Sequence, residues 1–181
     1  MPRPWFCWAT ATRSNRRPEA VGLGAAAVLA VAACSPSAPP GVDRDRLDAA
    51  VSRAVGDPNT CVLIGEAGGG RQLYRYNTHT ACERELPSCE DETLSKATEL
   101  LRRVARDGRP VATSCNTVAD ASRGVGWAAG PIEGTRLVYA AVMEGDRAFP
   151  GRMMADRLEG AFRRAEVSKP ADAPEARRET P

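Results

Sequence analysis

The stretch that decides the fold is RLVYAAVM, residues 136–143. It is apolar on both faces of an extended chain, which is typical of a strand covered on both sides. We therefore expect it to be the central strand of a sheet. Similar patterns, bounded by glycine-containing turns, predict four more strands. These lie at residues 60–65, 71–76, 110–114 and 124–129.

Helical periodicity marks three further segments. Residues 43–55 and 151–165 carry apolar stripes near the two ends of the domain. The longest pattern covers residues 88–107, with Ser88 placed to cap it and Gly108 after its end. The predicted fold class is α+β: a five-stranded antiparallel sheet with terminal helices and one central helix, in the order α-β-β-α-β-β-β-α.

The N-terminal region indicates export. Residues 20–34, AVGLGAAAVLAVAAC, follow a basic segment and are too short to span a hydrocarbon core, which takes about 20 residues. The ending Val-Ala-Ala-Cys resembles the lipobox of bacterial lipoproteins, in which the cysteine is acylated and becomes the new N-terminus. The resemblance implies a signal peptide at 1–33 and a lipid anchor on Cys34. The alternative is an ordinary signal peptide that stops at a cysteine.

The remaining chain is predicted to be one domain with two loose ends. Residues 34–42 (CSPSAPPGV) are expected to form a flexible tether, residues 43–166 the α+β domain, and residues 167–181 a disordered tail. Loss of the signal changes the formal charge from +2 to −1, because four arginines and one glutamate leave with it. A near-neutral chain lacks the basic surface of a nucleic-acid-binding protein.

Four cysteines follow the lipobox: Cys61, Cys82, Cys89 and Cys115. An even number in an exported protein predicts two disulfide bonds. Zinc sites use close pairs such as C-x-x-C, and these spacings are wide, so no metal and no cofactor is expected. His79 is the only histidine and is predicted to be a solvated loop residue rather than a general base.

The order of elements resembles the α/β core of serine β-lactamases and penicillin-binding transpeptidases, in which a pair of terminal helices covers a five-stranded sheet. The resemblance covers about residues 43–166. TCVLIGEAGGGRQLYRYN is similar to the family's first hairpin, SCNTVADASRGVGWAAG to its third and fourth strands, and GRMMADRLEGAF to its C-terminal helix. It implies a cleft between the start of the central helix and the third strand, with candidate residues Ser88, Ser114 and Asn116.

This sequence departs from the family at the residues that carry its chemistry. The nucleophile of the family lies in Ser-x-x-Lys, where the lysine activates the serine, and no Ser-x-x-Lys occurs here. Ser88 is instead followed by Cys-Glu-Asp, and Ser114-Cys115-Asn116 takes the place of the Lys-Thr-Gly strand. The cleft is therefore expected to be vestigial. Ser88 is interpreted as a helix cap, and Glu90, Asp91 and Glu92 as residues that favour the helix dipole rather than a cation site.

Three functions are consistent with these features. The first is a lipid-anchored envelope protein with a non-catalytic penicillin-binding-like core, which binds an envelope protein or a peptidoglycan fragment. The second is a cryptic serine hydrolase, similar to a β-lactamase, that uses Ser88. The third is an interaction module similar to roadblock or longin domains, which are typically cytoplasmic. Ser35 follows Cys34, and similar lipoproteins of diderm bacteria are released to the outer membrane and face the periplasm.

The disulfide pairing follows partly from the predicted fold and partly from the resemblance. Cys61 opens one strand of a hairpin and Cys82 lies shortly beyond the end of its partner, so antiparallel pairing brings them together. The resemblance implies that Cys89 and Cys115 face each other across the former active-site cleft. The alternative joins Cys82 to Cys89 and Cys61 to Cys115.

Overall fold

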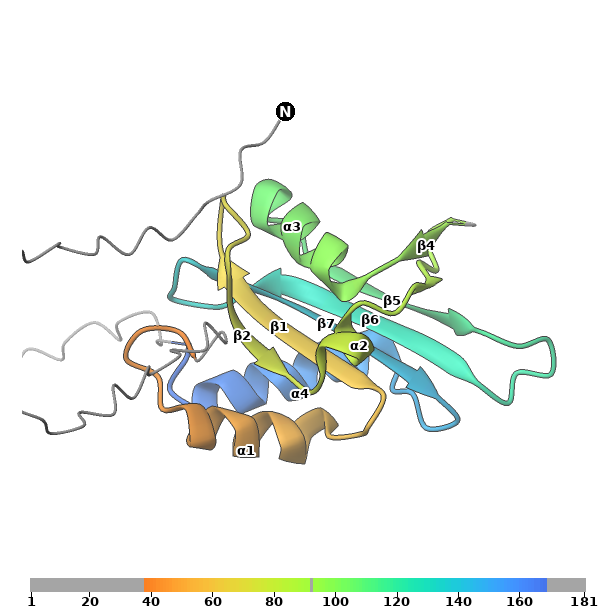
Figure 1. Ribbon diagram of the computed structural model, residues 1–181, viewed down its shortest axis with the longest axis horizontal. Coiled ribbons are helices and arrows are strands. Elements are labelled where there is room, and N and C mark those ends of the chain that lie inside the picture. The colour runs from red at the N-terminus through yellow and green to blue at the C-terminus, as the bar shows by residue number, and fades with distance from the viewer. Residues whose placement is uncertain (1–37, 92, 169–181) are drawn as a thin grey trace, which may run out of the picture. The chain divides into compact units, whose positions relative to one another are not determined.

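The computed structural model describes residues 38–91 and 93–168 (Figure 1). The expected signal peptide, Cys34 and the residues after 168 lie outside the described residues. In order along the chain, the described elements are α1 (Arg44–Val55), β1 (Thr60–Glu66), β2 (Gln72–Tyr76), α2 (His79–Cys82), β3 (Leu86–Pro87), β4 (Leu94–Ser95), α3 (Ala97–Asp107), β5 (Val111–Asn116), β6 (Gly124–Pro131), β7 (Leu137–Gly145) and α4 (Gly151–Arg164).

Five strands form one antiparallel sheet in the order β2-β1-β7-β6-β5. The prediction that residues 136–143 form the central strand is confirmed, since β7 pairs with β1 on one side and with β6 on the other. Strands β3 and β4 form a separate two-stranded hairpin. The predicted α+β class and the antiparallel sheet are therefore confirmed.

The helices cover the two faces of the sheet unequally. Helices α1 and α4 lie side by side on one face, and α3 lies on the other (Figure 1). Side chains of β7 alternate between the two resulting cores. Tyr139, Ala141 and Met143 face α1 and α4, whereas Val138, Ala140 and Val142 face α3. This alternation explains why the strand is apolar along its whole length.

Helix α4 approaches the backbone of β6 and β5 without a side chain between them. A Cβ atom on Gly126 of β6 would lie 2.0 Å from the Phe149 carbonyl oxygen. A Cβ atom on Gly151, the first residue of α4, would lie 2.2 Å from the Trp127 carbonyl oxygen. Glycine is required at both positions, because any Cβ would overlap backbone atoms of β6 or of the segment that leads into α4.

The domain extends beyond the boundaries expected from the sequence at both ends. Residues 39–42, expected to belong to a flexible tether, form a turn in which Val42 N donates to Pro39 O (3.1 Å) and Gly41 has φ +79°. Pro-Gly at the two central positions suits a type II turn, which explains the order. Beyond α4, Val167 is buried in the core on the α1 and α4 side. All residues of both cores lie between Val42 and Val167.

Candidate functional site

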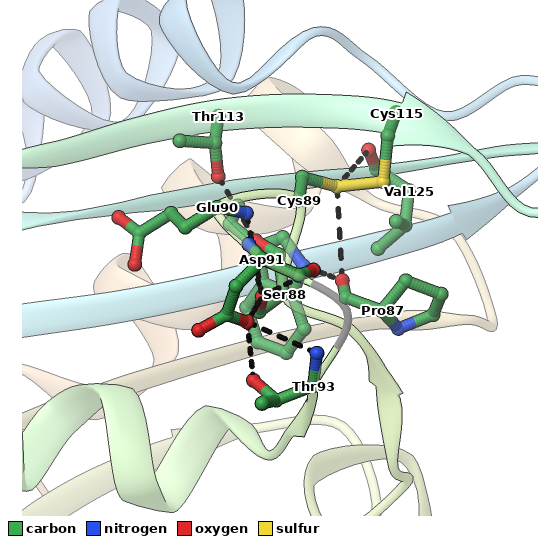
Figure 2. The surroundings of a disulfide bond; sticks show 10 residues. Pro87, Ser88, Cys89, Glu90, Asp91, Thr93, Thr113, Cys115 and Val125 are labelled. Carbon is green, nitrogen blue, oxygen red and sulfur yellow. Dashed lines mark hydrogen bonds between the residues drawn. A yellow bond between two sulfur atoms is a disulfide. The ribbon is translucent and has the colours of Figure 1, made fainter.

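The segment that carries Ser88 is a turn closed by side chains (Figure 2). The Ser88 hydroxyl donates to Asp91 Oδ1 at 2.7 Å, and the backbone N–H groups of Glu90 and Asp91 lie 3.3 Å from Ser88 Oγ. Asp91 Oδ1 also accepts from Thr93 N (3.0 Å) and from the Thr93 hydroxyl. The carboxylate thus closes the turn between β3 and β4.

The predicted helix over residues 88–107 is wrong in its first nine residues, because α3 begins at Ala97. Serine, aspartate and threonine side chains compete for backbone groups and stabilise turns instead of helices. Cys89 has φ +64°, and Leu94, expected on the buried stripe, is 59% exposed. Helix α3 starts where Glu99 Oε2 accepts from Lys96 N (3.2 Å).

This geometry places neither a helix N-terminus nor a strong base beside Ser88. Ser88 does not precede a helix, so the backbone N–H groups of a helix N-terminus are not available to stabilise an oxyanion. Hydrogen bonds from Thr93, and then from Ser88, hold the pKa of Asp91 below its usual value. A carboxylate with a lowered pKa is a weak general base. His79 lies exposed on α2, and no hydrogen bond or ion pair joins its ring to another residue of the described segments.

A disulfide between Cys89 and Cys115 fixes the turn to β5 (Figure 2). Two hydrogen bonds reinforce it: Trp127 Nε1 donates to Pro87 O (2.7 Å), and Thr113 Oγ1 lies 3.4 Å from Ser88 O. Trp127 belongs to the core on the α3 side, so the turn lies on that face of the sheet. A second disulfide joins Cys61 to Cys82. These are the two pairs expected from the sequence, rather than the alternative pairing.

Ser114 and Asn116 lie on the other face of β5. Burial alternates along this strand, with Thr113 and Cys115 partly buried and Ser114 and Asn116 exposed. Ser114 pairs with Gly126, whose missing side chain would point at the start of α4. Ser114 and Asn116 line a hollow of about 330 Å³ with Phe149 and Pro150. The structure therefore does not bring Ser88 together with Ser114 and Asn116, because the sheet separates them.

Glu90 and Asp91, two of the acidic residues near Ser88, each interact with protein side chains. Glu90 pairs with Arg103 (2.7 Å), and Asp91 closes the turn. The residues expected to favour a helix dipole therefore lie before the helix. Among residues 38–91 and 93–168, no group of three or more histidine, cysteine, aspartate or glutamate side chains could hold a metal ion.

A buried ion-pair cluster at one end of the sheet was missed by the sequence analysis. Glu144, near the end of β7, has a side chain that is only 5% exposed. Its carboxylate accepts from Arg123 Nε (3.0 Å) and Arg123 Nη2 (2.9 Å), and from Arg84 Nη2 (2.9 Å). The cluster ties the segment after α2 and the β5–β6 loop to the central strand. The signal available in the sequence was a lone carboxylate at the end of an apolar strand.

We expect Glu144→Gln to lower the free energy of unfolding by about 2 kcal/mol at pH 7. A fully buried pair costs about 3–5 kcal/mol when one partner is lost, but both arginines here are partly exposed. The hydrogen bonds from Arg123, and then from Arg84, lower the pKa of Glu144 although burial opposes the shift. The carboxylate therefore stabilises the fold above its unfolded pKa, and this contribution is lost as the pH falls through the lower folded pKa.

Urea unfolding at pH 7 and at pH 3 measures this effect. The difference between the wild type and Glu144→Gln should shrink at the lower pH. Glu90→Gln is the matched control, because the Glu90–Arg103 pair is exposed and its loss should change stability by less than about 0.5 kcal/mol. Equal effects of the two substitutions would contradict the role assigned to Glu144.

Comparisons of the chain with protein-family models, with curated proteins and with solved structures gave no match. Within the described residues, no helix has the length and apolar character needed to cross a bilayer.

Proposed function

We propose that this protein is an exported, lipid-anchored binding protein of the bacterial cell envelope whose penicillin-binding-like core is not catalytic. The observation that carries the proposal is that all four cysteines after Cys34 are joined in two disulfide bonds. Structural disulfides persist in oxidising compartments and are rare in the cytoplasm. The same reasoning disfavours the interaction modules similar to roadblock and longin domains, which are typically cytoplasmic.

The proposed anchor is a lipid on Cys34, and the proposed location is the outer membrane, facing the periplasm. The short apolar segment before Cys34 and the sequence Val-Ala-Ala-Cys support a processed lipoprotein. Ser35 after the cysteine supports release to the outer membrane in a diderm host.

The proposed partner is an envelope protein or a peptidoglycan fragment, and β5 is the surface that favours binding. It is an edge strand, so it has backbone groups available to pair with an added strand. The hollow lined by Ser114, Asn116 and Phe149 lies beside this edge and offers hydroxyl and amide groups next to an aromatic ring. A partner in an extended conformation could use both features at once.

The absence of catalysis rests on the turn that holds Ser88. The Ser88 hydroxyl donates a hydrogen bond to the Asp91 carboxylate, whose pKa is lowered. The three residues that follow Ser88, Cys-Glu-Asp, include no lysine. The purified protein should show no mass increase after incubation with penicillin. A covalent adduct that disappears in Ser88→Ala would overturn the non-catalytic assignment in favour of a serine hydrolase.

Cys34→Ala tests the anchor directly. Without the thiol there is no site for acylation, so the variant should accumulate as the unprocessed precursor or as a soluble form. Detergent phase separation and the mass of the mature chain are the measurements. Cys7→Ala is the matched control, because Cys7 lies in the expected signal peptide and should not affect the anchor. A shortened Cys34→Ala chain that still enters the detergent phase would contradict lipidation.

A further inference from the structure

The described residues begin with a turn that lies at one end of the sheet. Pro39 is buried within this turn, and residues 39–42 line a hollow of about 670 Å³. The opposite wall consists of the β6–β7 turn (residues 134–137) and of Glu166 and Val167 after α4. The turn is therefore part of the domain surface at the end where β1 meets β2 and β6 meets β7.

The proposed lipid on Cys34 must lie close to this end. Five peptide units join Cys34 to Pro39, and a fully extended chain of that length spans at most about 18 Å. This limit holds for every conformation of the intervening residues. If Cys34 is acylated, as the proposed function requires, the end of the domain that carries the turn is held near the bilayer surface.

The same end carries arginines that form no ion pair with another described residue. Arg136 lies beside the β1–β2 turn, since its carbonyl accepts from Ala67 N (2.9 Å), and Arg102 lies next to Gly70 of that turn. Arg109 follows the C-terminus of α3. All members of this set are exposed: Arg102, Arg109, Arg136, Arg163 and Arg164.

The carboxylates at this end do not neutralise these arginines. Several of them form ion pairs, and the four that do not are one fewer than the five unpaired arginines. Glu66 pairs with Arg71, Glu166 with Arg46 and Asp107 with Arg106. Four carboxylates at this end form no ion pair among the described residues: Asp43, which caps α1, Asp45, Glu133 and Glu159. Positive charge is therefore in excess where the chain leaves toward Cys34.

The opposite end of the sheet has a different charge. Five carboxylates there form no ion pair with a described residue, and they outnumber the three exposed arginines that also form none, Arg53, Arg147 and Arg152. The five carboxylates are Asp57, Glu83, Asp91, Asp120 and Asp146. An anionic surface would attract the first end and repel the second, which orients the molecule. We propose that the basic end, defined by the five unpaired arginines, lies on the phosphate groups of an anionic phospholipid membrane.

The orientation can be measured on the lipidated mature protein in vesicles of phosphatidylcholine and phosphatidylglycerol that contain a nitroxide-headgroup lipid. We expect the amide signals of Gly41, Gly70 and Gly134 to be broadened beyond detection. Those of Asp120 and Asp146, at the opposite end, should be retained. Uniform broadening, or broadening of the opposite end, would overturn the proposal while leaving lipidation intact.

The contribution of charge to membrane binding is measured without the lipid, on the mature chain from residue 34 with Cys34→Ser, which contains every core residue of the described segments. Sedimentation with phosphatidylglycerol vesicles should lose about 100-fold in affinity in R102Q/R109Q/R136Q, about fivefold for each arginine near an anionic surface. The matched control is R53Q/R147Q/R152Q, which removes the same charge from exposed positions at the opposite end and should change affinity less than threefold.

The two experiments separate the proposals. Equal losses in both triple variants would mean that only total charge matters, and the basic end would be rejected. No binding of the wild-type chain to phosphatidylglycerol vesicles would also reject it. A chain that binds through its basic end but is not acylated in cells would support this inference and contradict the anchor. Intact Trp127 fluorescence verifies that each variant is folded.

Discussion

Gly126→Ala should destabilise the protein by about 4 kcal/mol or more, and a soluble folded variant is not expected at 37 °C. The new Cβ would lie 2.0 Å from the Phe149 carbonyl oxygen and 3.3 Å from the Gly151 backbone nitrogen. Neither atom can move alone, because Gly151 itself lies directly on the Trp127 and Thr113 backbone. The change would therefore lift the start of α4 from the sheet, and overpacking of this kind is among the costliest single substitutions.

Gly130→Ala is the matched control, because Gly130 lies on the same strand and the same face of β6. Its nearest neighbour would be a Tyr139 ring carbon at 3.6 Å, which is an ordinary contact. We expect a change of less than about 1 kcal/mol, since alanine also restricts the unfolded chain. Urea unfolding followed by circular dichroism compares the two variants. Similar stabilities would show that α4 does not need the close approach.

Trp127→Ala should lower the free energy of unfolding by about 4 kcal/mol. The side chain is 2% exposed and lies in the core on the α3 side, where truncation of a tryptophan typically costs about 3–5 kcal/mol. The substitution also removes the donor to Pro87 O. Loss of that bond should loosen the Ser88 turn, so amide exchange of residues 88–91 should accelerate more than that of β1.

Trp127→Phe separates the two contributions. It keeps an aromatic ring in the core but removes the indole N–H, so we expect a loss of about 1–2 kcal/mol together with faster exchange in the turn. If exchange in the turn is unchanged in Trp127→Phe, the hydrogen bond does not hold the turn in place. Trp127 is the only tryptophan after residue 33, so the tryptophan fluorescence of the mature wild-type chain reports on this site alone.

The sheet could be predicted because the pattern of apolar residues in each strand indicates which faces of that strand are buried. Residues 136–143 are apolar on both faces, and β7 lies between two other strands with a core on either side. The hairpin of β1 and β2 was indicated by a glycine turn, and its antiparallel pairing places Cys61 near Cys82. Local pattern and tertiary structure agree in these elements.

The start of α3 could not be predicted, because acidic residues before an apolar stripe favour a helix N-terminus and a side-chain turn equally well. Tertiary contacts determine that the segment forms a turn. The Cys89–Cys115 disulfide and the hydrogen bond from Trp127 Nε1 to Pro87 O hold it in a non-helical conformation. The separation of Ser88 from Ser114 depends on the same path. The Glu144 cluster needs three segments that are distant in sequence.

The two disulfides join consecutive cysteines and enclose loops that do not overlap, 61–82 and 89–115. In a chain that crosses a membrane from its N-terminus, each cysteine would therefore meet its partner before the next pair emerges. Oxidation in order of emergence would give the native connectivity at once, without a later exchange of partners. Formation of the native disulfides would then need an oxidant but no disulfide isomerase.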